Sequence, residues 1–116
     1  MPTKRKKLVW YGDSLRRLRD FSPDARKAAG FELDRIQLGR EPSDWKPMTS
    51  IGPGVKETRI WAEQGYRVIY VAKFLDEVSV LHAFEKKSQK TSKIVIELAQ
   101  QRYRKLINER RRHEEA

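Results

Sequence analysis

The basic side chains in the middle of the chain are the groups with the clearest capacity for chemistry. Arg59 and Arg67 flank the Glu63-Gln64-Gly65 segment, and Lys86 and Lys87 follow the next apolar run. An arginine clamps two phosphate oxygens in one plane, whereas a lysine supplies a mobile point charge. Cleavage of RNA also needs a base for the ribose 2′-hydroxyl and an acid for the leaving 5′-oxygen. Lys86 and Lys87 are candidates for this proton transfer, because adjacent positive charge lowers the pKa of a lysine.

Three further side chains extend this candidate RNA site. Lys90 continues the basic run, Tyr70 offers a hydroxyl to a phosphate, and His82 is a candidate acid or base. Tyr70 and His82 also fit a sheet core, since both lie among apolar neighbours. The two roles remain open at this point.

The cations have plainer interpretations as well. Arg59 and Arg67 fit exposed strand positions paired with Glu57 and Glu63, because surface arginines commonly form such pairs. The lysine pair fits a solvated connection between two elements.

Other kinds of catalytic site lack the residues that they need. The chain has no Cys and only two His, His82 and His113, so we expect neither a metal site nor a cofactor. Gly52-Pro53-Gly54 precedes a predicted strand rather than a helix, unlike a phosphate-binding loop. No His is placed to activate a serine nucleophile.

A three-stranded meander is predicted to position the basic residues. Val55 to Trp61 alternates, and residues 66–73 and 78–84 are rich in Val, Ile, Tyr and Phe. A three-residue turn ending in a left-handed Gly65 would connect the first two strands. That turn places Trp61 opposite Arg67, so alternation brings Arg59 to the same face as Arg67.

Flanking elements complete an α+β fold, a small antiparallel-rich sheet flanked by helices in the order β-α-α-β-β-β-α. Residues 8–11 form the first strand, Ser14 caps a short helix, and Ser22-Pro23 begins a second helix that ends at Gly39. Residues 40–54, rich in Pro and Gly, are predicted to be a loop, with Trp45 and Met48 packed onto the core. The last helix starts at Thr91 or Ser92 and frays into residues 110–115.

Length and charge limit the remaining possibilities. The 116 residues suffice for one domain over 1–116, with basic ends 1–7 and 109–116 that we expect to be flexible. A formal charge of +10 favours polyanionic partners. The longest apolar run is far shorter than the roughly 20 residues that span a bilayer, so we expect a cytoplasmic protein without a membrane partner.

Three segments together resemble a known family. Glu57-Thr58-Arg59, Gly65 to Tyr70 and Leu81 to Thr91 are similar to the phage-derived HigB-type toxins of the RelE superfamily, over about residues 7–108. The resemblance implies the toxin of a type II toxin-antitoxin module with a RelE-like fold. It also implies a metal-independent endoribonuclease that cleaves mRNA in the ribosomal A site, with Arg67 holding the scissile phosphate.

The resemblance also implies partners. The cognate antitoxin would be a helix-turn-helix DNA-binding protein, and operator DNA would be contacted only through it. Since the chain is basic, we expect an antitoxin that is acidic where it docks. Candidate docking residues on the first two helices are Arg16, Arg17, Arg26 and Lys27.

Two alternative functions remain. ParE-like members of the same superfamily inhibit DNA gyrase without catalysis, and fold alone does not separate the two activities. A plain nucleic-acid-binding module would use the basic ends, and its binding would weaken steeply with salt.

Overall fold

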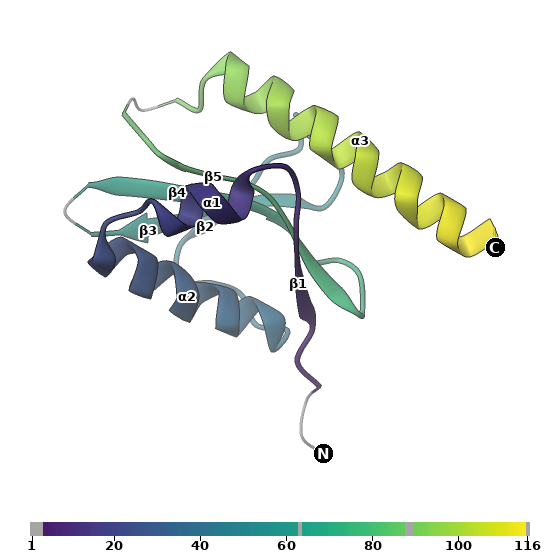
Figure 1. Ribbon diagram of the computed structural model, residues 1–116, viewed down its shortest axis with the longest axis horizontal. Helices are drawn as coiled ribbons and strands as arrows, with labels where there is room; N and C mark the ends of the chain where they lie inside the picture. Colours follow the sequence, from purple (N-terminus) through teal and green to yellow (C-terminus); the bar gives the residue numbers. More distant parts are fainter. Residues whose placement is uncertain (1–3, 63, 88–89, 116) are drawn as a thin grey trace.

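The computed structural model describes residues 4–62, 64–87 and 90–115. Within this part the chain forms a five-stranded mixed sheet with helices on both faces (Figure 1), which confirms the predicted α+β class. The elements are β1 (Lys7–Trp10), α1 (Ser14–Arg19), α2 (Pro23–Gln37), β2 (Trp45–Pro47), β3 (Val55–Trp61), β4 (Gly65–Val71), β5 (Glu77–Glu85) and α3 (Lys93–Glu115).

The strand order β1-β5-β4-β3-β2 contains the predicted meander. β4 pairs antiparallel with both β3 and β5, and β1 runs parallel to β5 at one edge of the sheet. β2 corrects the prediction of a loop over residues 40–54, because it pairs with β3 at the other edge. A short strand that ends in Pro47 is tolerated there, since an edge position does not need every backbone N–H.

In the β3–β4 hairpin the side chains lie on the predicted faces of the sheet, but the pairing of the two strands differs from the prediction. Trp61 pairs with Gly65, and Arg59 lies directly opposite Arg67. The predicted pairing of Trp61 with Arg67 is therefore wrong, and Gly65 lies in β4 rather than in a left-handed turn position. The register of β4 against β3 differs from the prediction by two residues, and because this shift is even, the alternation of faces is unchanged. Arg59 and Arg67 share a face, as predicted.

Both ends of α2 follow the expected local chemistry. The Ser22 hydroxyl accepts the Ala25 N–H at the start of α2, and Gly39 has the left-handed φ of 81° just beyond its end. At α1 the prediction is wrong. Asp13 occupies the cap position, and Ser14 is buried inside the helix, where its hydroxyl donates to the Val80 carbonyl.

α3 is longer than its apolar pattern indicates. It begins after Ser92, whose hydroxyl accepts the Val95 N–H, and it continues through the charged segment that we expected to fray. Arg110 stabilises this segment, because it forms ion pairs with Asp76 and Glu77.

The sheet separates two cores. α1 and α2 cover the face that carries Tyr66, Val68 and Tyr70, whereas α3 lies over the face of Arg67 and Ile69 (Figure 1). Among the strands α3 contacts chiefly β5, and Trp61 at the hairpin end of β3 is exposed. In the described part of the chain, no helix has the length and apolar character required to cross a bilayer.

Candidate functional site

Five charged side chains gather on the α3 face, at the hairpin end of the sheet. Glu57, on β3, is fully buried, and its Oε1 lies 3.4 Å from Nε of Arg67 and 3.9 Å from Nζ of Lys46. The Thr91 hydroxyl donates to its other oxygen at 2.9 Å. We call the set Lys46, Glu57, Arg59, Arg67 and Lys86 the Glu57 cluster.

Arg67 is held more firmly than a surface arginine. It is 7% exposed, and its NH1 donates to the Tyr66 carbonyl at 3.0 Å. Burial lowers the pKa of Arg67, while the Glu57 carboxylate opposes that shift. The Arg67 Nε makes no aligned hydrogen bond to any described residue, so its contact with Glu57 is an ion pair. The guanidinium is therefore fixed while retaining N–H groups that could bind a phosphate.

Asp44 holds the neighbouring Arg59 and Trp61. One oxygen of Asp44 accepts from Arg59 at 2.9 Å, and the other accepts the indole N–H of Trp61 at 2.8 Å. The hydrogen bond from Trp61 lowers the pKa of Asp44, with a further contribution from Arg59. Trp61 is 65% exposed, and its ring centroid lies 5.6 Å from the guanidinium carbon of Arg67.

Lys86 joins the cluster through the sheet backbone. Its N–H donates to the Gly65 carbonyl at 2.8 Å, directly beyond the last residue of β5. Burial lowers the pKa of Lys86; Glu57 opposes that shift, while Arg67 and two more cations add to it. A lysine in this environment is better suited to accept a proton than a free surface lysine.

Lys87 and Lys90 lie beside the cluster on the rim of a groove. The groove has a volume of about 320 Å³, and Arg17 and Lys86 contribute to the same rim. Apolar side chains of α3 also line the groove, Ile94 and Leu98 among them. Of the predicted lysine pair, the structure places Lys86 by Arg67 and leaves Lys87 exposed.

His82 occupies the core position that the sequence left open. It is 3% exposed, its ring stacks on Phe84, and its Nδ1 lies 3.2 Å from a guanidinium nitrogen of Arg102. Because arginine only donates, Nδ1 accepts in this contact. Burial and the charge of Arg102 lower the pKa of His82 to about 4. His82 is therefore neutral at physiological pH. It lies against Arg102 of α3 and lines the same groove as Lys86, Lys87 and Lys90.

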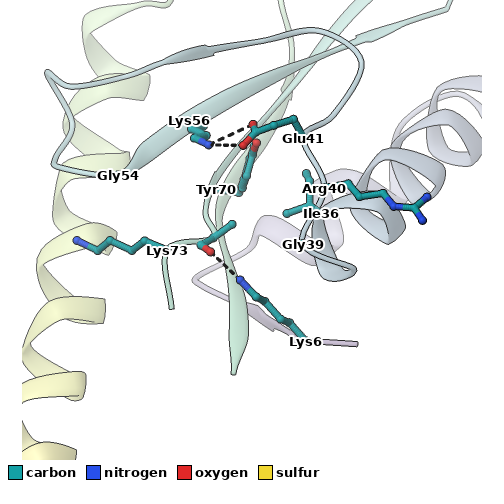
Figure 2. A pocket seen from close by; sticks show the side chains of 10 residues that line it. Lys6, Ile36, Gly39, Arg40, Glu41, Gly54, Lys56, Tyr70 and Lys73 are labelled. Atoms are coloured by element: carbon teal, nitrogen blue, oxygen red, sulfur yellow. Dashed lines mark hydrogen bonds and ion pairs between the residues drawn. The ribbon is translucent and has the colours of Figure 1, made fainter. Parts of the chain in front are cut away.

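Tyr70 lies on the opposite face of the sheet from Arg67. Figure 2 shows it in a small cavity on the α2 side, where its hydroxyl points toward Lys56 and Glu41. The side chain is 1% exposed, and its hydroxyl has no hydrogen-bond partner among the described residues. Burial raises its pKa above the ordinary range. The structure thus separates Tyr70 from the predicted RNA site.

The predicted docking residues lie exposed on α1 and α2. Arg16 and Arg17 form ion pairs with Asp13, and Arg26 donates to the Arg19 carbonyl. Lys27 has no polar partner in the described part of the chain.

The alternative prediction, that Arg59 and Arg67 pair with Glu57 and Glu63, is correct for only one of the two arginines. Arg67 does pair with Glu57, but as a buried residue, and Arg59 pairs with Asp44 instead of a glutamate. The predicted partner Glu63 lies outside the described residues.

Sequence reasoning missed the roles of four residues around Arg67. Alternation along β3 could have placed Glu57 and Trp61 with Arg59, because odd positions share a face. Lys46 and Asp44 carried no such signal. Lys46 lies on β2 and Asp44 directly precedes it, and the Pro-rich sequence around this strand predicted a loop.

Comparison with known proteins identifies one related group. A family model described as phage derived protein Gp49-like (DUF891) matches residues 16–104, which is more than half of the chain and includes the whole Glu57 cluster. No curated protein matches the chain.

Proposed function

The chain belongs to the phage-derived Gp49-like family, and we propose that it is a HigB-like toxin of the RelE superfamily. Its activity in this proposal is endonucleolytic cleavage of mRNA on the ribosome. One observation carries the proposal, the convergence of Arg59, Arg67 and Lys86 around the buried Glu57 carboxylate, beside the exposed ring of Trp61. Such a group of fixed cations matches the charge of a phosphodiester.

Each residue of the cluster has a role in the proposed reaction. Arg67 and Arg59 bind the scissile phosphate and stabilise the charge that develops on its oxygens. Lys86, in its neutral form, takes the proton from the ribose 2′-hydroxyl, and the resulting 2′-oxygen attacks phosphorus. The bond to the 5′-oxygen breaks, and an ammonium group donates the proton that this oxygen needs. In this proposal Lys46, which shares the Glu57 carboxylate with Arg67, makes that donation.

The proposed partner is an antitoxin that covers this site. A surface with charge +10 attracts RNA without selection, so an inhibitor needs acidic groups that compete for the same cations. Lys87 and Lys90 at the groove rim, together with Arg16, Arg17, Arg26 and Lys27 on the first helices, are the candidate contacts. Operator DNA would be bound through the antitoxin.

The primary test is Arg67→Ala in cells. We expect the variant to lose growth arrest and to cleave mRNA 10²- to 10³-fold more slowly, because one electrostatic contact to the transition state commonly contributes about that factor. Primer extension on cellular mRNA after induction measures the new 5′ ends. Arg40→Ala is the matched control, since Arg40 is exposed just beyond α2 and forms no ion pair with a described residue.

Three results would contradict the proposal. DNA breaks without new RNA ends would indicate a gyrase inhibitor. Expression without toxicity would indicate a plain nucleic-acid-binding module. Failure of every neighbouring reading frame to bind the protein on co-expression would remove the toxin-antitoxin assignment.

A further inference from the structure

Trp61 is an exposed aromatic side chain at a charged site. It ends β3 and is 65% exposed, whereas Trp10 and Trp45 are half-buried. An indole in water leaves a large apolar area unburied, which costs free energy unless another group covers it. Exposure alone is not unusual for a single apolar residue, but it leaves the Trp61 ring available for contact with a ligand.

The ring is nevertheless held in position from two sides. Asp44 accepts its N–H at 2.8 Å, and the same carboxylate is anchored by Arg59. The Arg67 guanidinium lies within cation-π range of the ring, at 5.6 Å. Arg67 belongs to the Glu57 cluster, and Asp44 also holds Arg59 of that cluster, so the indole has a defined orientation next to it.

The neighbouring strand leaves the ring uncovered. The residue opposite Trp61 on β4 is Gly65, which has no side chain that could pack on the indole. A Cβ at Gly65 would lie only 3.3 Å from NH1 of Arg67, so a larger residue there would disturb the guanidinium as well. Gly65 thus keeps space open beside both Trp61 and Arg67.

We infer that Trp61 is a stacking platform for one nucleobase of single-stranded RNA whose adjacent phosphate is bound by Arg67. The inference rests on the proposed function for its substrate class. Aromatic rings bind bases of single-stranded RNA by stacking, since every base offers a π-face and is unpaired. One nucleotide carries both a base and a phosphate, so a single nucleotide can contact the indole and the guanidinium together. This role differs from that of the catalytic cations, because the indole contacts the base and transfers no proton.

The test measures binding without cleavage. A dye-labelled RNA oligonucleotide with 2′-O-methyl groups cannot be cleaved through its 2′-oxygen, and its affinity is measured by fluorescence anisotropy. We expect Trp61→Leu to weaken binding by roughly 5- to 150-fold, the range reported for loss of one base-aromatic stack. Trp61→Phe should lose less, because it keeps a ring. Phe31→Leu is the matched control, since Phe31 is 62% exposed on α2, away from the cluster.

A second set of oligonucleotides identifies stacking as the cause. Each member lacks one base but keeps every phosphate. At one position the loss of the base should weaken binding to the wild-type protein and should remove the difference between wild type and Trp61→Leu. The inference would be overturned if wild type and Trp61→Leu bound the intact oligonucleotide with equal affinity. It would also be overturned if their affinities differed as much on every abasic oligonucleotide as on the intact one. Absence of binding by the wild type would also overturn it.

Failure of the proposed function has a separate signature. If the wild type produced no new RNA ends in cells, cleavage would be refuted, whereas the uncleavable oligonucleotide would still measure the stack on Trp61.

Discussion

At the scale of single residues, the buried pair of Glu57 and Arg67 sets the character of the site. A buried carboxylate is costly unless cations and donors surround it, and here Arg67, Lys46 and Thr91 do so. The pair need not increase stability over an apolar pair of similar size. It does fix the Arg67 guanidinium before any substrate binds, which lowers the cost of organising the site.

Glu57→Gln should expose the cost of breaking this pair. The substitution leaves Arg67 buried without its counter-charge, so we expect a loss of about 3 kcal/mol in the free energy of unfolding, measured with urea. The double variant Glu57→Gln/Arg67→Met should recover much of that stability while remaining inactive. Equal stability of the wild type and Glu57→Gln would show that the carboxylate does not hold Arg67.

His82 should make stability depend on pH in the mildly acid range. Its pKa is lowered to about 4 in the folded protein, against about 6.5 when unfolded, so the unfolded chain binds the extra proton first. Stability is therefore complete above about pH 6.5 and declines as the pH falls toward 4, by up to about 3 kcal/mol. Urea titrations at pH 7 and pH 5 measure the decline. His82→Gln keeps an acceptor for Arg102, and its stability should decline less between pH 7 and pH 5. If the variant and the wild type declined equally, groups other than His82 would be the cause.

At the scale of elements, one ion pair connects α3 to the start of α1. Asp13 accepts from Arg102 at 2.7 Å and from Arg17 at 2.9 Å. Gly12, with a φ of 56°, permits the close approach, since a Cβ there would lie 2.4 Å from the Arg102 guanidinium. The same guanidinium contacts His82 and the Leu81 carbonyl of β5. Arg102 thus joins two helices and a strand.

Asp13→Asn should weaken this connection. The hydrogen bond from Arg102 lowers the pKa of the Asp13 carboxyl well below its usual range, so its contribution is present above about pH 4 and is lost as the pH falls further. We expect the variant to be less stable by about 2 kcal/mol at pH 7, after allowance for partial exposure, and to approach the wild type at pH 2. Thermal unfolding at both pH values measures the difference, and a constant difference would exclude the ion pair as its cause.

At the scale of the whole molecule, acidic and basic residues are used differently. Acidic side chains such as Asp13, Asp44 and Glu57 are paired within the fold. Many basic ones are not, and four of these project from the second half of α3. They are exposed and have no ion pair with any described residue: Arg104, Lys105, Arg111 and Arg112. The net charge of +10 therefore lies largely on surfaces open to polyanions.

Replacing these four residues by Gln should reduce the salt dependence of RNA binding. If each contacts one phosphate, the slope of log affinity against log salt should fall by about 3, because each contact to a single strand releases about 0.7 counterion. Filter binding over a range of salt concentrations measures the slope. The variant should retain cleavage at low salt, since the Glu57 cluster is unaltered. An unchanged slope would show that RNA does not contact this half of α3.

Local patterns in the sequence determined much of the fold. Alternation predicted the three central strands and the shared face of Arg59 and Arg67. The shared face survived an error in hairpin register because the pairing was shifted by two residues, an even number. The Ser22 and Gly39 signals marked the ends of α2, since capping depends on neighbouring residues alone. The same alternation would have separated Tyr70 from Arg67, had it been applied along β4.

Long-range pairing decided what local patterns could not. β2 forms only because β3 supplies hydrogen-bond partners, and it brings Lys46 and the adjoining Asp44 to the site. Glu57 is buried among Lys46, Arg67 and Thr91, which come from other parts of the chain, whereas Trp61 on the same strand is exposed. Such effects follow from contacts between residues far apart in the chain. The charge of each side chain could therefore be known from the sequence, while its environment, and with it its chemistry, was determined by the tertiary structure.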